Sequence, residues 1–340
     1  MTPFAKSLMS FLFLFIIYVA LGKLGLETTS LSKFATLLWA PSGIALAALL
    51  LGGGVYAPVI FLAAWTLNMW VGARWDVAAC IAVGNLAEAL LAWWLLRKMS
   101  FQKSFEFASE TWKFMLTALV APGIAALVGP VVLHSQGYIE EGSLGSVITS
   151  WWIGDMAGIV IITPLVLSWK RSSVREALWT VKTFPNWRNV EVISLYISAI
   201  LMSWLVYGSP ISYLGDPLTP RFYFLVPVFL WAAMRFTQKE LTLVIGVTVL
   251  GAILGLNYPS LESQLTNAHK ALFEIEIFYI FATPVFLTVL AIGLQQDSLK
   301  RKMLKNEEEL KEKTRELESR NLELERFASF PSHDLKEPLR

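Results

Sequence analysis

Long apolar segments recur along most of this chain, and they limit it to a fold that crosses a membrane. A helix needs about 20 mostly apolar residues to span the hydrocarbon core of a bilayer. We expect about ten such helices; if the second and eighth segments re-enter the membrane instead of crossing it, eight spans remain. The predicted segments are residues 7–24, 34–52, 54–72, 77–97, 111–133, 145–169, 190–208, 221–235, 239–256 and 272–295.

Composition supports this fold class and shows where the membrane part ends. Hydrophobic residues make up 55% of the 340 residues, which is too apolar for a soluble domain of this size. Residues 296–340 hold 11 Lys or Arg and 11 Asp or Glu, so this tail belongs in water. We therefore predict an all-α polytopic membrane protein over residues 1–295, followed by a cytoplasmic helix.

The charges of the loops predict the topology, because cytoplasmic loops carry an excess of Lys and Arg. The loops at residues 97–113 and 170–188 are basic, whereas the loop at residues 134–145 contains Glu140 and Glu141 and no Lys or Arg. Alternating from these loops places both termini in the cytoplasm. The alternative for the first segment is a cleaved signal peptide.

Several polar residues fall within the apolar segments. A charge at bilayer depth is costly and is usually functional or paired. Glu88 lies near the middle of its segment with Asn85 on the same helical face, and Asp155 stands between Gly154 and Gly158, which allow close helix approach. The alternative interpretation is a structural hydrogen-bond network that locks the helices together. The predicted intramembrane polar or sensing site comprises Asp155, Glu88, Asn85, Asn68, Arg235 and Trp152.

Other residue types argue against further sites. We expect the many Trp residues, Trp39 and Trp65 among them, to anchor the protein at the membrane interface or to pack the bundle. One cysteine, Cys80, and three scattered histidines predict neither an intrachain disulfide nor a metal site. The sequence has no Walker phosphate loop, no Gly-rich nucleotide fingerprint and no nucleic-acid-binding patch, so we expect no nucleic-acid partner.

The charged tail has a seven-residue apolar repeat over residues 296–326. Leu at one core position with polar residues at the other predicts a parallel two-stranded coiled coil and hence a homodimer. A single charged amphipathic helix is the alternative. The predicted dimer seam consists of Met303, Leu310, Leu317, Asn321 and Leu324, in which Asn321 favours a dimer and fixes its register.

The C-terminal residues carry a second kind of chemistry. A neutral imidazole is a good nucleophile near pH 7, and a carboxylate beside it fixes its tautomer. His333 and Asp334 supply this pair. Phe327, Ala328 and residues 332–340 match the phosphoacceptor H-box, so residues 327–340 resemble the start of the dimerisation and phosphoacceptor region of sensor histidine kinases.

The resemblance to the H-box implies roles for these residues. His333 would accept a phosphoryl group from ATP and pass it to a response regulator, and Asp334 would orient the imidazole. The ATP-binding domain of such kinases follows the H-box, so we expect this chain to bind no cofactor itself, and ATP with Mg²⁺ is implied for a missing kinase domain. Pro331 departs from the family pattern, which has a helix former there.

The membrane part resembles the integral membrane sensor domain called MASE1. Residues 39–46 look like its W-x-P-x-G-[IL]-A segment, residues 85–88 like its N-x-x-E helix, and residues 151–158 like its W-W-x-G-D-x-x-G element. Residues 231–236 look like its W-A-x-R-F turn, although Thr237 stands where the family often has Gly. The family is usually drawn with about eight spans, which conflicts with our expectation of ten.

Together these features predict the sensory part of a bacterial two-component sensor histidine kinase in the inner membrane. Its partners would be a second copy of the chain, a response regulator, the lipid bilayer and, as a further candidate, another membrane protein. A transporter or channel with a coiled-coil tail is the alternative, because intramembrane acids and Pro- or Gly-broken helices are also typical of that class. A membrane interaction module whose output a partner sets is a third reading.

Overall fold

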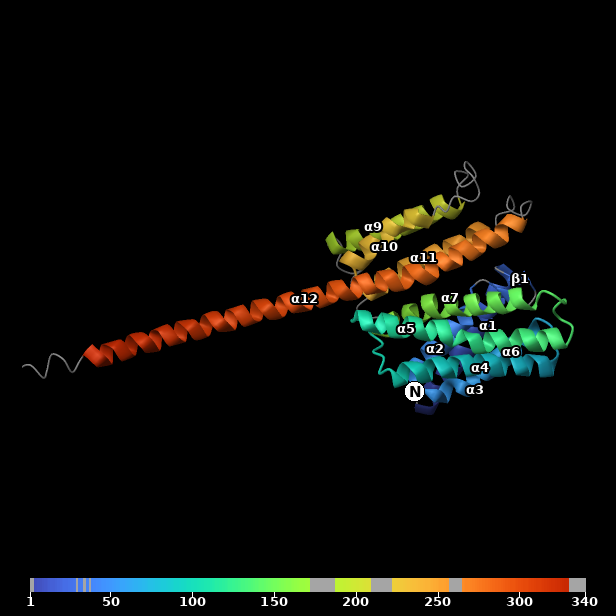
Figure 1. The fold of residues 1–340 in the computed structure, drawn as a ribbon, viewed down its shortest axis with the longest axis horizontal. Coiled ribbons are helices and arrows are strands. Elements are labelled where there is room, and N and C mark those ends of the chain that lie inside the picture. Colours follow the sequence, from blue (N-terminus) through green and yellow to red (C-terminus); the bar gives the residue numbers. More distant parts are fainter. Residues whose placement is uncertain are drawn as a thin grey trace, which may run out of the picture. The chain divides into compact units, whose positions relative to one another are not determined.

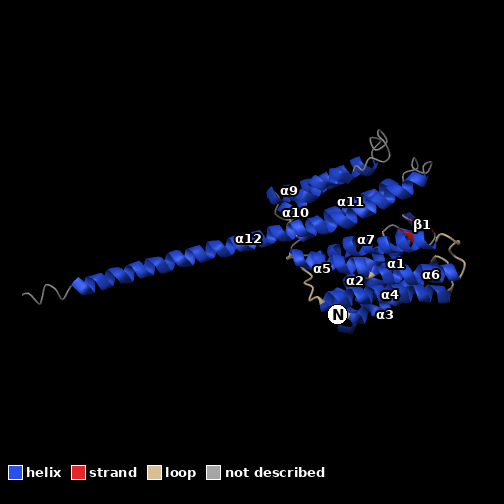
Figure 2. Cartoon of the chain, viewed as in Figure 1, coloured by secondary structure: helices blue, strands red, loops and turns tan. Residues whose placement is uncertain are grey.

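The described residues fold almost entirely into helices, with one short pair of strands (Figure 1, Figure 2). The computed structural model describes residues 3–28, 30–32, 35–36, 38–171, 187–208, 222–256 and 265–329. Contacts divide the chain into two compact units, Met1–Ala291 and Ile292–Arg340. The first unit holds the apolar helices and the second holds the charged tail.

The first half of the larger unit packs around a short central helix. Its elements are α1 (Pro3–Thr28), β1 (Ser30–Ser32), β2 (Ala35–Thr36), α2 (Ala40–Gly52), the 3-10 helix η1 (Gly54–Tyr56), α3 (Ala57–Trp70), α4 (Trp75–Lys98), α5 (Ala108–Val120), α6 (Pro122–Ser135) and α7 (Leu144–Arg171). The strands β1 and β2 pair antiparallel between α1 and α2.

The second half of this unit begins with α9 (Trp187–Ser203) and the π-helix η2 (Trp204–Gly208). The 3-10 helix η4 (Phe222–Leu225), α10 (Val226–Arg235) and α11 (Gln238–Leu256) follow, and α12 (Leu265–Ser329) completes the fold. The Phe229 ring of α10 lies 5.5 Å from the Phe286 ring of α12, edge to face. This aromatic contact helps to hold the first part of α12 in the apolar core.

Six helices among the described residues are long and apolar enough to cross a membrane, which confirms a multi-pass membrane protein. A helix lies in each of the ten predicted segments, but the count of ten spans is not confirmed and stays a prediction. The six candidate spans are Ser7–Glu27, Trp75–Lys98, Ala108–Ser135, Leu144–Trp169, Trp187–Tyr207 and the segment that begins at Phe273.

The central helix α2 is too short to cross a bilayer alone. Its 13 residues rise about 20 Å, whereas the hydrocarbon core is about 30 Å thick. Pro41 suits its first turn, and Gly53 follows its end with φ +80°, a conformation that glycine adopts without strain. Leu46 belongs to a core cluster shared with α7, and Leu49 to a cluster shared with α1 and α3. A helix that is buried on all sides needs apolar residues on all of its faces, and the sequence of α2 meets this requirement.

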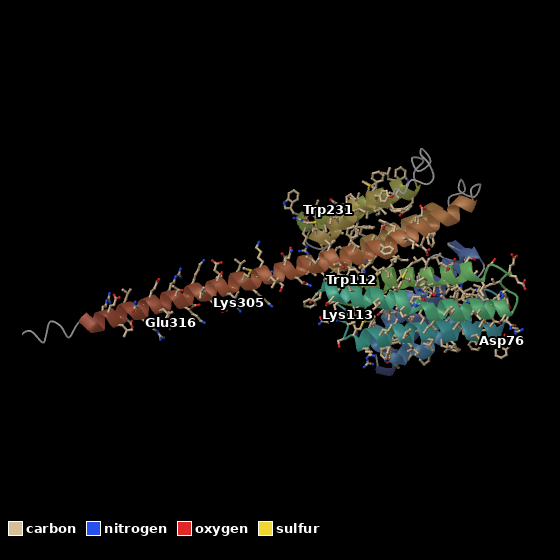
Figure 3. The ribbon with its side chains drawn as sticks, in the orientation of Figure 1. Asp76, Trp112, Lys113, Trp231, Lys305 and Glu316 are labelled. Atoms are coloured by element: carbon tan, nitrogen blue, oxygen red, sulfur yellow. The ribbon has the colours of Figure 1, made fainter. Side chains whose placement is uncertain are left out.

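Helix α12 continues from the apolar core into the charged tail. Its charged part carries ion pairs one turn apart, Lys311 with Glu307 and Arg320 with Glu316, both at 2.7 Å. Figure 3 shows charged side chains such as Lys305 and Glu316 along this part. The repeat predicted as a dimer seam is therefore helical, while the coiled coil itself stays a prediction.

Candidate functional site

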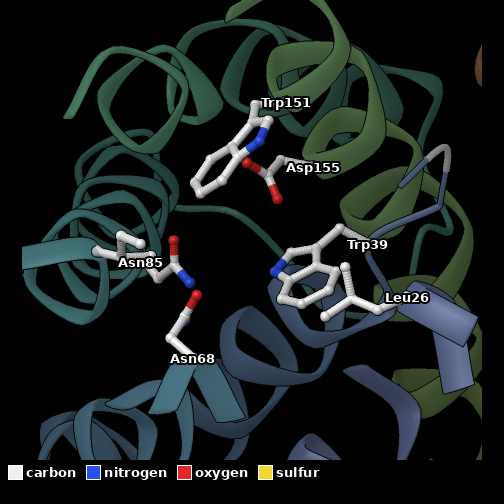
Figure 4. Close-up of a pocket in the computed structure, with 7 residues that line it drawn as sticks. Leu26, Trp39, Asn68, Asn85, Trp151 and Asp155 are labelled. Carbon is white, nitrogen blue, oxygen red and sulfur yellow. The ribbon is translucent and has the colours of Figure 1, made fainter. Parts of the chain in front are cut away.

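The structure brings four of the six predicted polar residues together inside the helical bundle. Glu88 and Asp155 are only 1% and 3% exposed, and Asn68 and Asn85 are each 7% exposed. Three of the four line a cavity of about 30 Å³ (Figure 4). The cavity is lined by Leu26, Trp39, Asn68, Ile81, Asn85, Trp151 and Asp155.

Close packing of α2 against α7 builds one wall of this site. A Cβ atom at Gly158 would overlap the backbone carbonyl of Trp39, and one at Gly43 would overlap the carbonyl of Gly158. The Trp39 N–H donates to the Gly154 carbonyl at 3.0 Å, and the Thr163 hydroxyl donates to the Gly43 carbonyl at 3.0 Å. Glycines at positions 43 and 158 therefore allow the two backbones to meet.

Asp155 is held at the start of α2. The Ser42 hydroxyl donates to Oδ1 of Asp155 at 2.9 Å. Ser42 is the third residue of α2, so this carboxyl group lies beside the first turn of that helix. The N-terminus of a helix carries unpaired N–H groups and a partial positive charge, which favour a nearby negative charge. The short helix α2 thus places an electropositive end inside the bundle.

Glu88 of α4 lies next to Asp155 of α7. Its carboxyl group contacts the side chains of Asp155 and Ser42, and its Oε2 atom is buried without a hydrogen-bond partner. Such an unsatisfied buried oxygen is costly, and most are explained by function or by an ion or water. The two acids therefore form a close pair, and the described residues supply hydrogen bonds to only some of its carboxyl oxygens.

Amide groups complete the polar surface of the cavity. The Asn68 amide donates to the Ala64 carbonyl at 2.9 Å, and its oxygen points toward Asn85 (Figure 4). The Asn85 amide in turn contacts the hydroxyl of Tyr18, which is 1% exposed. Oxygen atoms from α3, α4 and α7 thus converge on one small space.

The other two predicted residues lie elsewhere. Arg235 ends α10 and pairs with Glu191 at 2.5 Å, where its side chain is 61% exposed. The Trp152 indole donates to the Leu119 carbonyl at 2.8 Å. Successive helical residues point about 100° apart, so Trp151 faces the cavity and Trp152 does not. The structure therefore does not bring Arg235 and Trp152 together with Asp155.

Sequence reasoning missed several residues of the site. Trp39, expected to be an interfacial anchor or a packing residue, lines the cavity instead. The Nε1 atom of Trp151 is buried without a hydrogen-bond partner. Ser42 could have been noticed within the segment at residues 39–46, but Tyr18 stands in an apolar run with no pattern that marks it. Its role arises only from the packing of α1.

The predicted phosphoacceptor pair lies outside the described residues, because the described part of α12 ends at Ser329. His333, Asp334 and Pro331 are therefore assessed from sequence alone. Among the residues that the structure covers, no three His, Cys, Asp or Glu side chains gather into a group that could hold a metal ion. The candidate site within the described residues is therefore the buried pair of Glu88 and Asp155.

Comparison with known proteins identifies the membrane domain. No curated protein and no solved structure matches the chain. The sequence model of the MASE1 family matches residues 9–297, which includes every residue that lines the cavity. MASE1 is a membrane sensory domain found in sensor kinases and similar regulators, so a membrane sensory role fits this chain. With most of its length matched, the chain belongs to the MASE1 family.

Proposed function

We propose that this chain is the sensory part of a bacterial inner-membrane sensor histidine kinase, with both termini in the cytoplasm. In this proposal a stimulus at the buried polar site changes the packing of α12, and α12 repositions His333. The observation that carries the proposal is that α12 is one helix from Leu265 to Ser329. The same helix belongs to the membrane core and bears the seven-residue repeat.

The two parts of α12 differ in the way a signalling helix requires. Tyr279 and Leu287 are 2% and 1% exposed, so the first part is locked into the membrane bundle. Leu310 and Leu317 are 66% and 67% exposed in the single chain. A stiff helix transmits a small shift or rotation of one part to the other, and a stimulus that favours one packing moves the population toward it.

The exposed repeat supports a homodimer through the tail. Met303 and Leu324 are 71% and 67% exposed, like the two leucines between them. Large apolar side chains at seven-residue spacing are buried when a second copy packs against them in parallel. Oxidation of a Leu317→Cys variant in membranes is expected to give a disulfide-linked dimer, whereas Glu318→Cys, one position off the seam, should give much less. Equal yields from both would contradict the seam.

The chemical output is proposed from the H-box resemblance. His333 would carry the phosphoryl group, Asp334 would orient its imidazole, and a response regulator would receive the group. ATP and Mg²⁺ would be bound by the kinase domain that the H-box resemblance implies. Phosphoryl transfer depends mainly on positioning and charge stabilisation, so moving His333 relative to that domain is enough to regulate it.

The decisive experiment measures phosphorylation of the intact protein in membrane vesicles with labelled ATP. His333→Gln is expected to abolish the acid-labile phosphate. Asp155→Asn and Glu88→Gln are expected to alter the response to stimulus, whereas Asp76→Asn, a change to an exposed acid that pairs with Arg74, should not. Label that survives in His333→Gln would refute the phosphoacceptor role, and normal responses in both folded site variants would refute the sensory site.

A further inference from the structure

The buried acid pair has no positive partner within the described structure. None of the ion pairs between described residues includes Glu88 or Asp155. Both side chains are almost fully buried in a domain that crosses a membrane. A buried charge without a compensating partner is expensive, and more so in a bilayer. The partial positive charge at the start of α2 offsets part of one negative charge and not two, so a further positive charge is needed here.

The groups that face the pair from the surrounding helices are neutral or weakly acidic. Helix α1 contributes Tyr18, α2 contributes Ser42, α3 contributes Asn68 and α4 contributes Asn85 beside Glu88. Tyr18 is the one further titratable group among them, and it adds no positive charge. Two carboxyl groups in contact repel each other unless a proton or another cation lies between them.

The cavity beside Asp155 restricts what that cation is. A water molecule needs roughly 10–15 Å³ of such space, so a cavity of about 30 Å³ holds a small ion with a water molecule and excludes an organic ligand of ordinary size. Its polar wall offers a carboxylate and amide oxygens, which suit hard cations. Two carboxyl groups in contact that retain one proton carry a single negative charge, which matches a monovalent ion.

We propose that Asp155, Glu88 and the adjoining cavity form a binding site for a monovalent cation, either the proton or an alkali-metal ion. This inference deepens the proposed sensory function and rests on it for its biological role. The unsatisfied Oε2 atom of Glu88 marks where the site is incomplete. The Trp39 and Trp151 rings add faces that attract cations.

Residues at or next to three helix ends line the cavity. Leu26 and Asn68 lie two residues before the ends of α1 and α3, and Trp39 directly precedes α2. Chain connectivity places these three helix ends at one end of the bundle, together with the start of α4. Our topology prediction puts this end outside the cytoplasm, as it does the loop at residues 134–145. Interrupted helices whose ends face an ion are typical of intramembrane ion sites.

The test uses the purified full chain in lipid nanodiscs and follows thermal unfolding. Choline chloride is replaced by NaCl or KCl at constant ionic strength, and the series is repeated from pH 5 to pH 9. Binding of an alkali-metal ion is expected to raise the Tm saturably with that ion. Binding of a proton is expected to make the Tm depend on pH and not on the alkali-metal ion. A wild-type chain whose Tm responds to neither would overturn the proposal.

Variants assign the response to the acid pair. In Asp155→Asn the apparent affinity for the ion is expected to fall roughly tenfold or more, or the pH dependence to disappear. Glu88→Gln should act in the same direction and serves where Asp155→Asn fails to fold. Asp76→Asn, also on α4, should respond like the wild type. Wild-type responses in both site variants would overturn the site, whereas intact binding with unchanged signalling in the full kinase would overturn only the sensory role.

Discussion

The close contact between α2 and α7 makes a sharp prediction for Gly158→Ala. The added Cβ would meet the carbonyl oxygen and carbon of Trp39 and the nitrogen of Ala40, all backbone atoms that cannot rotate away. Helix α2 must then separate from α7, which strains the hydrogen bonds Trp39 to Gly154, Ser42 to Asp155 and Thr163 to Gly43.

The magnitude follows from these contacts. Overpacking costs about 1–3 kcal/mol, and each weakened hydrogen bond contributes about 1 kcal/mol, while the higher helix propensity of Ala returns about 1 kcal/mol. The unfolding free energy should therefore fall by about 3–5 kcal/mol. Titration with sodium dodecyl sulfate in mixed micelles measures this quantity for a helical membrane protein.

Gly145→Ala is the matched control on the same helix. A Cβ atom at Gly145 would meet no atom within 4 Å, so only the gain in helix propensity remains. Its unfolding free energy should be unchanged or higher by up to about 1 kcal/mol. Equal unfolding free energies for Gly158→Ala and Gly145→Ala would refute the close approach of α2 to α7, and with it the explanation of the glycines in both segments.

Three further substitutions test separate contacts by the same measurement. Thr163→Val removes the buried bond to the Gly43 carbonyl and should lower the unfolding free energy by about 1 kcal/mol; no change would mean that the bond is not formed. Arg235→Ala breaks an exposed pair with Glu191, so it should cost less than about 1 kcal/mol and leave the cation response intact. Glu276→Met replaces a carboxyl group whose Oε1 atom is buried without a partner, and should raise the unfolding free energy by about 1–3 kcal/mol. A fall would show that Glu276 has a stabilising partner.

Sequence patterns predicted which helices carry the polar site, but they did not predict how all of its side chains are arranged. Asn85 and Glu88 lie on one helical face because they are three residues apart, and the glycines beside Asp155 indicated a close helix contact. Trp39 was expected to be an anchor or a packing residue because tryptophan is common at membrane interfaces. Trp93 and Trp94 do lie against Arg97 and Lys98, as interfacial residues would. The sequence alone does not separate the two kinds of tryptophan, because only the fold decides which ring faces a cavity.

The number of membrane spans could not be predicted from the apolar segments alone, and the reason is physical. An apolar composition shows that a helix is buried in lipid or protein, and does not distinguish the two. Helix α2 is apolar all round, and α1, α3, α4 and α7 contribute to the apolar clusters around it. Helices α3 and α10 are likewise apolar and short. Length, and not hydropathy, separates them from the six candidate spans.

Two hydroxyl pairs join helices within the larger unit. Helix α7 carries Asp155 and, further along, Ser168, whose hydroxyl lies 3.0 Å from that of Thr242 on α11. Across the core of the second half, the Tyr207 hydroxyl lies 3.3 Å from that of Tyr279 on α12. Coupling between the acid pair and α12 requires an element with two arrangements that both sites bias. A hydroxyl pair can supply two such arrangements, because either oxygen can donate and the donor can change without leaving a cavity.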